Sequence, residues 1–536
     1  MARQLPLRPA RPYAMLLPLL LPLLSANAPT KKPHIFTILA DDFGWHNIGF
    51  RNPEIRSPNL DKAFATGITL NRHYVFKYCS PTRSSLLTGR LPLHVNQNNE
   101  ANLIVSKSGI DIRMSLLPKR LKAAGYATAM TGKGHLGARS HANLPVNRGF
   151  DRHFGFLKGG EDHQTQCLGD TDFHGPDLWR DHGPAHGENG TFSTLLYGHE
   201  AVRIVKEHKL PGPLYVYLPY QVTHSPYQIP PGPYENPSDP VQRRTFNAMV
   251  NIMDEAFGNL TQVLTTRSMI DDTLIMFSAD NGGVYHNGQL GNNWPLRGQK
   301  TSDWEGGVRA TAFLWGGANV LPSALRGTES NAFIHVCDWY ATLLTLVGID
   351  PADGGGSGTG FPAIDSMDQW SVLLKPNATV ADSLRTELPL SFCPNTDPEL
   401  GNRGADNCCP TAEGGGWEAN GTAIPPSGWR NGALIQKAVS DDGKTHSFFK
   451  LVWGTQFGFG VHTSPNSPNA SGQSHNSSDP GCPIGCVFDI LADPNEINDI
   501  SLANPNLFAS MLKRQSAIGL TVHQTNYSDV PDSSCA

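Results

Sequence analysis

Several features that would point to other classes of protein are missing from this sequence of 536 residues. Basic residues are not in excess, since 42 Lys and Arg stand against 47 Asp and Glu for a formal net charge of −5. General nucleic-acid binding needs a basic balance and is therefore not expected. Beyond the N-terminal segment no apolar run is long enough to cross a bilayer. No internal repeat is visible, and no Cys and His pairs have the spacing of a zinc site. What remains is a globular chain long enough for one to three domains.

The first 28 residues have the three parts of a secretory signal peptide. Arg3, Arg8 and Arg11 form a basic stretch, and an apolar run too short to span a bilayer follows over residues 14–24. Ala26-Asn27-Ala28 then has the small residues of a cleavage site. An uncleaved signal anchor is the alternative. We expect residues 1–28 to be removed and the protein to be extracellular or lysosomal, and loss of three arginines takes the net charge from −5 to −8.

Nine cysteines suit the oxidising environment of the secretory pathway. Setting Cys79 aside leaves eight, an even number compatible with disulfides, although the sequence does not fix their connectivity. Cys482 and Cys486 are close enough to pair, and Cys393 can meet Cys408 or Cys409. N-glycosylation sequons, several of which we expect to carry glycans, occur at Asn189, Asn259, Asn377, Asn420, Asn469, Asn476 and Asn526.

Apolar runs alternate with helical patterns over roughly the first 350 residues. Strands are expected at residues 34–40, 126–131, 214–218, 273–278 and 312–315. Helices are expected from Ser57 onward and at residues 115–124, 191–209 and 243–266. Strands that alternate with helices predict an α/β domain with a mostly parallel sheet.

After about residue 350 the composition changes. Stretches rich in Gly, Ser, Pro and Asn are typical of long loops. Between them, residues 448–453 and 487–490 have the pattern of strands and residues 504–517 that of a helix. We therefore expect one domain over residues 29–380 and a smaller C-terminal domain with long loops over residues 381–536.

The ends of four predicted strands carry side chains suited to chemistry. They are Asp41-Asp42, Lys133 with His135, His224, and Asp280-Asn281. In a parallel sheet, functional residues gather just beyond the carboxyl ends of the strands, so we expect these residues to lie together. The three aspartates and Asn281 form the all-oxygen set that Ca²⁺ or Mg²⁺ prefers. For either acidic pair alone, an ordinary turn after a strand is the alternative.

The segment from Cys79 to Arg90 reads Cys-Ser-Pro-Thr-Arg-Ser-Ser-Leu-Leu-Thr-Gly-Arg and predicts a helix that begins near Cys79. A helix N-terminus offers unpaired N–H groups and the positive end of the helix dipole, which suit an anion or an ionised nucleophile. Arg83 adds a fork of donors that suits a tetrahedral oxyanion. For Cys-x-Pro-x-Arg alone, a disulfide cysteine beside a helix cap is the alternative, and the closing Leu-x-x-Gly-Arg argues against it.

This segment resembles the signature of the type I sulfatases. The resemblance implies that Cys79 is oxidised to formylglycine (3-oxoalanine) by the formylglycine-generating enzyme, and that the hydrated aldehyde attacks a sulfate ester. It also implies an alkaline-phosphatase-like fold, in which a large mixed, mostly parallel sheet is flanked by helices. A smaller C-terminal domain of antiparallel strands and a helix would follow.

Other segments extend the resemblance over about residues 33–515. Residues 125–137 resemble the family's second signature, residues 297–309 the segment that supplies Lys300, and residues 487–494 the C-terminal strand and turn. Residues 148–163 resemble the arylsulfatase B (N-acetylgalactosamine-4-sulfatase) branch. Two positions depart from the family pattern: Gly134 stands where a large aromatic is usual, and Thr82 replaces a Ser or Ala.

The resemblance also assigns roles to these residues. One Ca²⁺, or alternatively Mg²⁺, would be bound by Asp41, Asp42, the group derived from Cys79, Asp280 and Asn281. Sulfate would be bound by Arg83, Lys133, His224 and Lys300. Asp280 would act as base on the nucleophile, His224 would protonate the leaving alcohol, and His135 would help to release sulfate. Four further histidines are possible cleft residues without a role: His73, His94, His163 and His286.

The expected function is therefore hydrolysis of a sulfate monoester, with a sulfated glycan or amino sugar as the expected substrate. A phosphoester hydrolase of the same superfamily would usually have a Ser or Thr nucleophile and a second metal set, and neither is evident. A catalytically silent, glycan-binding relative would be expected to have lost Cys79, a metal carboxylate or a lysine. All of these are present, and only Gly134 favours the silent alternative.

Overall fold

The structure is a computed structural model of the chain. It describes residues 31–95, 109–138, 140–167, 175–233, 241–285, 290–394, 429–439, 446–454, 456 and 482–523. Several predictions fall outside the described residues, namely the signal peptide and those on His286, Cys408, Cys409, Asn420, Asn469, Asn476 and Asn526. Within the described ranges, no helix combines the length and the apolar character needed to cross a membrane.

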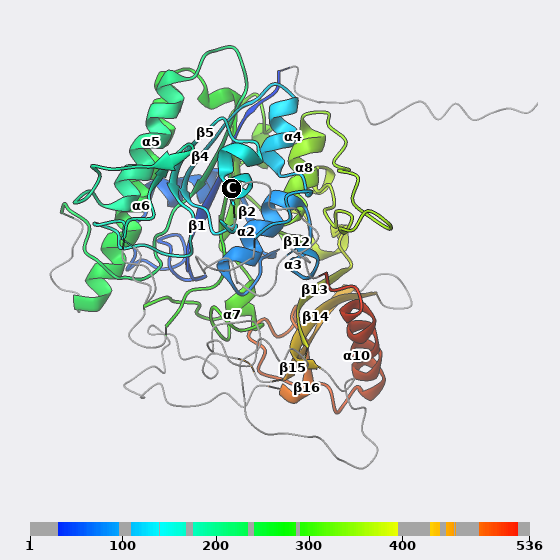
Figure 1. The fold of residues 1–536 in the computed structure, drawn as a ribbon. Helices are drawn as coiled ribbons and strands as arrows, with labels where there is room; N and C mark the ends of the chain where they lie inside the picture. Colours follow the sequence, from blue (N-terminus) through cyan, green and yellow to red (C-terminus); the bar gives the residue numbers. More distant parts are fainter. Residues whose placement is uncertain are drawn as a thin grey trace, which may run out of the picture.

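A ten-stranded mixed sheet forms the centre of the larger part of the molecule (Figure 1). Its strand order is β11-β2-β10-β9-β1-β8-β4-β5-β6-β7. The strands are β1 (His34–Ala40), β2 (Ile68–Leu70), β4 (Ala127–Lys133), β5 (Arg152–Phe156), β6 (Trp179–Arg180), β7 (Gly183–Pro184), β8 (Leu214–Pro219), β9 (Thr273–Ala279), β10 (Ala312–Gly316) and β11 (Thr328–Ser330).

The five strands β9, β1, β8, β4 and β5 are neighbours and run parallel. Every residue of β1, β8 and β9 is buried, which explains why these strands read as continuous apolar runs rather than alternating ones. The expected strand at 312–315 is confirmed as β10, but it pairs antiparallel with β9. The predicted α/β architecture with a mostly parallel sheet is thus confirmed.

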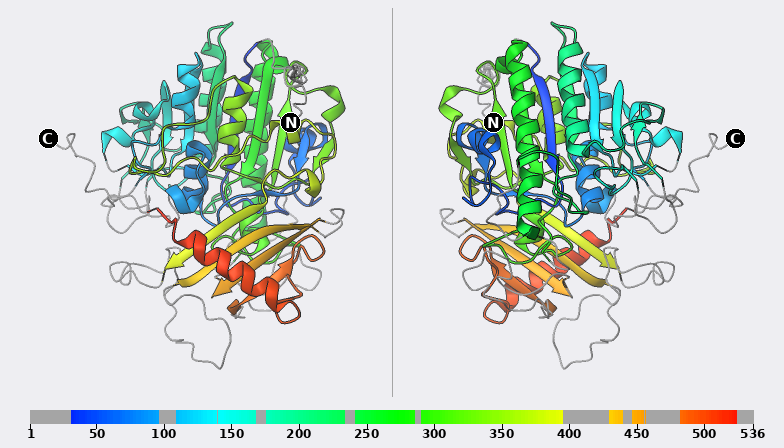
Figure 2. Two further views of the ribbon diagram at one scale, coloured as in Figure 1. Left: turned by 90° about the vertical axis from the view of Figure 1, so that its right-hand side faces the viewer. Right: turned by 90° about the vertical axis from the view of Figure 1, so that its left-hand side faces the viewer.

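Helices cover both faces of the sheet (Figure 2). On one face α1 and α5 pack against the long helix α6, and on the other α2, α4 and α8 pack together. Their bounds are α1 (Pro58–Thr66), α2 (Cys79–Thr88), α4 (Leu117–Ala123), α5 (Ser193–Glu207), α6 (Val241–Thr266) and α8 (Asp338–Leu346). Shorter elements are β3 (His73–Tyr74), which pairs with β12 (Ile334–His335), and the single turns α3 (Pro92–Val95), α7 (Glu305–Val308) and α9 (Trp370–Leu373).

A second, four-stranded antiparallel sheet follows in the chain and lies against one end of the larger part (Figure 2). It consists of β13 (Glu387–Pro394), β14 (Trp429–Val439), β15 (His446–Gly454) and β16 (Cys482–Asp489), and α10 (Pro505–Gly519) packs on it. Its buried residues form one cluster with Tyr74, Trp304 and Val308 of the larger part. The four-stranded sheet and the larger part therefore share a continuous apolar interface. The boundary at residues 380 and 381 stays a prediction.

The predicted disulfide between Cys482 and Cys486 is confirmed. Among the described residues, however, Cys167 and Cys337 are free thiols, as is Cys79. Cys337 is buried, and its sulfur lies 3.6 Å from the Arg385 guanidinium. Among the described residues, the cysteines other than Cys79 are therefore not all paired in disulfides.

Candidate active site

The predicted strand-end residues lie together at the carboxyl edge of four adjacent parallel strands. Asp41 and Asp42 follow β1, Lys133 ends β4 with His135 just beyond it, His224 follows β8, and Asp280 and Asn281 follow β9. Cys79 is the first residue of α2, as predicted, and Arg83 lies one turn further on. The interactions described below connect all ten predicted site residues except His135, whose side chain makes no hydrogen bond.

The carboxylates surround the N-terminus of α2. The Cys79 thiol donates to Asp41 Oδ1 at 3.3 Å, and the Asp42 backbone N–H donates to Asp280 Oδ1 at 3.2 Å. Asn281 Nδ2 donates to Asp42 Oδ1 at 2.8 Å, whereas the buried Asn281 Oδ1 has no hydrogen-bond partner in the structure. Ligand atoms of Asp41, Asp42, Cys79 and His224 lie within 4.8 Å of one another. An unpaired amide oxygen beside three buried carboxylates is the donor set of a hard divalent cation, so the residues fit the metal that the sequence predicts.

Three cations balance the three carboxylates. Arg83 donates two hydrogen bonds to Asp280 Oδ2, at 2.6 and 3.0 Å, and Lys300 Nζ lies 2.7 Å from Asp42 Oδ1. Lys133 forms an ion pair with Asp41. The six side chains together carry no net charge, so a bound divalent cation would leave an excess of two positive charges. A site of that kind favours an anionic substrate.

The thiol of Cys79 is not set up to act as a thiolate. Burial, together with the negative charges of Asp280 and Asp41, raises the pKa of Cys79 far above its ordinary value. The sequence left open an ionised nucleophile at this helix N-terminus, and this environment disfavours it for an unmodified cysteine.

Two of the three carboxyl groups in the site, Asp42 and Asp280, have pKa values shifted in opposite directions. Burial acts to raise the pKa of Asp42, but the charges of Lys300 and Lys133 outweigh it and hold that pKa well below its ordinary value. Burial and the neighbouring Asp41 charge raise the pKa of Asp280 to about 6, even though Arg83 opposes them. Of these two carboxyls, Asp280 is therefore the better proton acceptor near neutral pH.

His224 is a neutral imidazole whose free nitrogen points into the site. Its Nδ1–H donates to the Ser225 carbonyl at 2.7 Å, so Nε2 carries the lone pair, and Nε2 lies 3.8 Å from Asp42 Oδ2. Burial, reinforced by Lys300 and Lys133, lowers the pKa of His224 to about 3 despite the nearby Asp42. A negatively charged substrate would act in the opposite direction and favour the protonated form.

His135 is buried, and neither ring nitrogen has a hydrogen-bond partner in the structure. Burial and the charge of Lys133 hold its pKa well below the ordinary value. His135 and Asp42 both have left-handed backbone, with φ of 52° and 55°. Such conformations are uncommon for residues other than glycine and are often found at functional sites. Two unpaired nitrogens on a strained, buried residue fit a role towards a ligand.

The departure at Gly134 has a structural reason. A Cβ atom at this position would lie 3.0 Å from the Phe156 carbonyl oxygen, and the Gly134 N–H donates to that same oxygen at 2.7 Å. The next residue, His135, is held in the same way by the Leu157 carbonyl at 3.0 Å. Glycine thus allows the end of β4 to approach β5 closely while His135 keeps its place.

The sequence did not identify the residues that contact the predicted catalytic side chains and hold them in place. His163, which was left without a role, donates from Nε2 to the His224 carbonyl at 3.2 Å, and its Nδ1 accepts from Ser193 at 2.7 Å. His73 is instead a core residue that accepts from Trp339, and His94 pairs with Asp365. No local sequence signal distinguishes these three histidines, because their partners lie far away in the chain.

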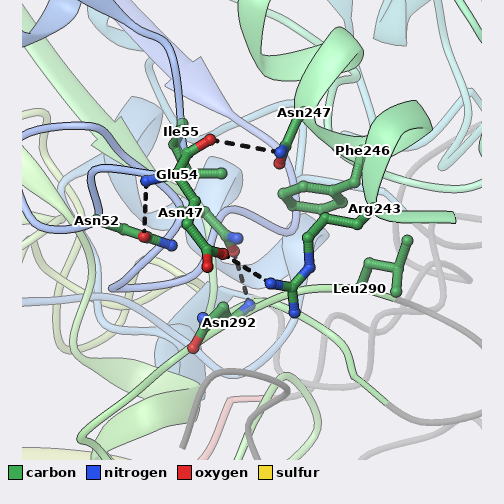
Figure 3. Close-up of a pocket in the computed structure, with 9 residues that line it drawn as sticks. All are labelled: Asn47, Asn52, Glu54, Ile55, Arg243, Phe246, Asn247, Leu290 and Asn292. Atoms are coloured by element: carbon green, nitrogen blue, oxygen red, sulfur yellow. Dashed lines mark hydrogen bonds and ion pairs between the residues drawn. The ribbon is translucent and has the colours of Figure 1, made fainter. Parts of the chain in front are cut away.

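A small cavity lies between the loop after β1, the loop after β9 and the start of α6 (Figure 3). Its volume of about 20 Å³ is room for one water molecule. Asn47 Oδ1 accepts from the backbone N–H groups of Gly44 and Asn292, and so holds the two loops that follow Asp42 and Asn281 against each other. None of the predicted catalytic residues lines it, so we assign this cavity a structural role.

The fold and the site together define an α/β protein with a buried site suited to a divalent cation and an anionic ligand. The chain belongs to the sulfatase family, whose family model matches residues 33–349. It is 31% identical over 512 residues to arylsulfatase J of Mus musculus, which covers 94% of this chain and 78% of that protein. It is also 30% identical over 373 residues to N-acetylgalactosamine-6-sulfatase of Homo sapiens, which covers 66% of this chain and 68% of that protein.

Among solved structures, the chain resembles Ps i-CgsB in complex with k-i-k-neocarrahexaose. The TM-score is 0.67 at 22% identity, and the likeness covers 92% of this chain and 94% of that one. At this identity the likeness concerns the fold. The arylsulfatase B resemblance of residues 148–163 stays a prediction.

Proposed function

We propose that this protein hydrolyses sulfate monoesters of a sulfated glycan, with formylglycine derived from Cys79 as its nucleophile and one divalent cation, Ca²⁺ or alternatively Mg²⁺, as its cofactor. The observation that carries the proposal is the position of Cys79. It stands at the start of α2, 3.3 Å from Asp41, inside a buried ring of three carboxylates and three cations. Maturation would require the formylglycine-generating enzyme, and the predicted signal peptide supports a location in the secretory pathway, extracellular or lysosomal.

The cation would be held by Asp41, Asp42, Asp280 and Asn281, next to the group at position 79. When bound, it supplies positive charge that stabilises an oxygen nucleophile. Asn281 would contribute its unpaired Oδ1, an atom that otherwise remains buried without a partner.

The residues of the chain divide the remaining work. Asp280 accepts a proton from the nucleophile, for which its raised pKa suits it. Arg83, Lys133 and Lys300 bind the sulfate oxygens and offset the charge that develops on them. His224 is neutral in the free protein, gains a proton when the anionic ester binds, and donates it to the leaving alcohol. His135 offers its unpaired nitrogens for the release of sulfate.

Two alternatives weaken on the same geometry. A silent glycan-binding protein does not need a complete set of carboxylates, cations and a buried cysteine, and here all of them lie in contact. A phosphoester hydrolase with two metals needs a second ligand set. Among the described residues, one group of His, Cys, Asp and Glu side chains has the geometry to hold a metal, and its members, Asp41, Asp42, Cys79 and His224, belong to this same site.

The first experiment is mass spectrometry of the peptide that contains Cys79, taken from protein secreted by a host with the modifying enzyme. We expect the mass of formylglycine, and an unmodified or disulfide-bonded Cys79 would contradict the proposed nucleophile. Turnover of N-acetylgalactosamine 4-sulfate against the 6-sulfate would then test the substrate. The arylsulfatase B resemblance predicts a preference for the 4-sulfate, and preference for the 6-sulfate would place the chain nearer to the other relative.

A further inference from the structure

The loop of residues 297–309 brings Lys300 to the site but is anchored mainly elsewhere. Lys300 itself contacts the larger part of the molecule, where Nζ lies 2.7 Å from Asp42 and its N–H donates to the Gly283 carbonyl at 3.3 Å. Three residues that follow it, Asp303 to Glu305, contact the C-terminal sheet. The position of Lys300 is therefore linked to a part of the chain that supplies none of the predicted catalytic residues.

A buried ion network joins this loop to the C-terminal sheet. Lys450 of β15 lies 3.0 Å from Glu305 and 2.8 Å from Glu496, and all three side chains are fully buried. Glu496 Oε2 also accepts from the Glu305 backbone N–H at 2.6 Å, and its carbonyl accepts from Arg297 at 2.8 Å. Glu305, Lys450 and Glu496, here called the Lys450 cluster, thus hold the loop at both ends.

A second network connects the loop to the segment before Cys79. Lys77 Nζ lies 2.8 Å from Asp303 Oδ2, which also accepts from Ser391 of β13 at 2.8 Å. The Thr301 N–H donates to the Lys77 carbonyl at 2.9 Å. Asp303 therefore links the C-terminal sheet to Lys77, and Lys77 in turn contacts Thr301, the residue after Lys300.

Two physical arguments indicate that these networks hold the loop of residues 297–309 in one conformation. Buried ion pairs are seldom more stabilising than apolar packing of the same volume, so stability alone does not account for them. Thr301 has φ of 82°, which is unusual for a β-branched residue and persists only where the surroundings enforce it. The enforced position is the one directly after Lys300.

We infer that the C-terminal part of the chain is a working part of the sulfate site. Lys450 of β15 and Glu496, which follows β16, are positioning residues that hold Glu305 and thereby present Lys300 to the sulfate group. The inference rests on the proposed function, since it takes sulfate as the ligand of Lys300. Neither residue touches the reacting atoms. Their effect is on the loop that carries Lys300.

The test compares Lys450→Met with a matched control, Arg385→Met. Arg385 is also buried and forms an ion pair, with Asp338, but it does not contact the loop of residues 297–309. With 4-nitrocatechol sulfate as substrate and inorganic sulfate as inhibitor, we expect Lys450→Met to raise KM and the inhibition constant about tenfold, as for a lost charge-assisted contact. Arg385→Met should lower thermal stability while both constants stay within about twofold. In a Lys300→Ala background, Lys450→Met should have little further effect.

Hydrogen–deuterium exchange of the loop provides a readout that does not depend on activity. Lys450→Met should increase deuterium uptake over residues 297–309, and Arg385→Met should not. Glu496→Gln, which keeps the side-chain shape, serves if Lys450→Met does not fold, with smaller changes of the same kind. Unchanged uptake and unchanged constants, or equal changes in the control, would overturn the inference. If the wild-type protein has no sulfatase activity, only the proposed function is contradicted. The exchange comparison still tests whether the Lys450 cluster holds the loop of residues 297–309.

Discussion

Two buried charge clusters contact the 297–309 loop, and they differ in whether their polar side chains have partners. In the Lys450 cluster, Glu305, Lys450 and Glu496 all have charged partners within the cluster. In the site at the carboxyl edge, Asn281 Oδ1 and both ring nitrogens of His135 have no hydrogen-bond partner. Asp42 and His135 also have left-handed backbone. Burying polar groups without partners is costly, so proteins keep such groups where a ligand completes them. The comparison supports the proposal that the second cluster binds a ligand, whereas the first holds the loop in place.

The largest effect should come from removing the nucleophile. Cys79→Ala takes away the only group from which formylglycine can form, so we expect turnover of a sulfate ester to fall by at least about a thousandfold. Cys337→Ala is the matched control, because Cys337 is also a buried free thiol but lies outside the site. Steady-state assays of both variants, with circular dichroism to check folding, make the comparison. Loss of activity in both variants, or in neither, would contradict the role of position 79.

The next effect concerns the unpaired oxygen at the site. Isothermal titration with Ca²⁺ alone should show one site per chain, and Asn281→Ala should weaken it about tenfold or more, since one ligand is lost. Glu305→Gln removes a buried carboxylate from the Lys450 cluster, where Lys450 already neutralises the charge, and should leave Ca²⁺ affinity unchanged. Equal weakening by both variants would mean that buried carboxylates in general, and not the unpaired set, determine cation binding.

A third effect is the pH dependence of stability that the Lys450 cluster contributes. Burial, opposed by Lys450, raises the pKa of Glu496 from 4.5 to about 7. The folded state therefore holds a proton that the unfolded state releases, so this contribution to stability is fully present below about pH 4.5 and is lost as the pH rises towards 7. The pKa of Glu305 is lowered, so its own contribution changes below pH 4.5 and does not overlap.

Urea unfolding at pH 5 and pH 7.5 measures this contribution. Glu496→Gln cannot ionise, so the pH dependence of its free energy of unfolding should be smaller than that of the wild type, by on the order of 2 kcal/mol. Asp177→Asn is a useful second variant, because burial raises the pKa of Asp177 to about 6 and gives the same sign over a lower pH window. Identical pH profiles for wild type and Glu496→Gln would show that Glu496 does not titrate in this range.

Most of the site was predictable from the sequence, whereas most of its support was not. Asp41, His224 and Asp280 each follow an apolar strand, and strand ends meet at one edge of a parallel sheet whatever the rest of the chain does. The direction of β10 was not predictable, since an apolar run carries no information on its partner. Lys450 and Glu496 were missed for a similar reason. Their role arises from contacts with Glu305, which is 145 residues from Lys450 and 191 residues from Glu496 in the sequence. A lone Lys or Glu in a strand or loop is normally expected to be exposed.

The smallest effect tests how tightly the binding site is built. Gly134→Ala places a methyl group about 3.0 Å from the Phe156 carbonyl, so β4 and β5 must separate by a few tenths of an ångström, and His135 moves with them. We expect kcat to fall only about two- to fivefold, because His135 still reaches its ligand but is less well aligned with it. Gly160→Ala is the control, since its Cβ would meet the His224 ring at an ordinary 3.4 Å. If Gly134→Ala leaves kcat unchanged while thermal stability falls, Phe156 yields without moving His135, and the close approach of the two strands serves the scaffold rather than the site.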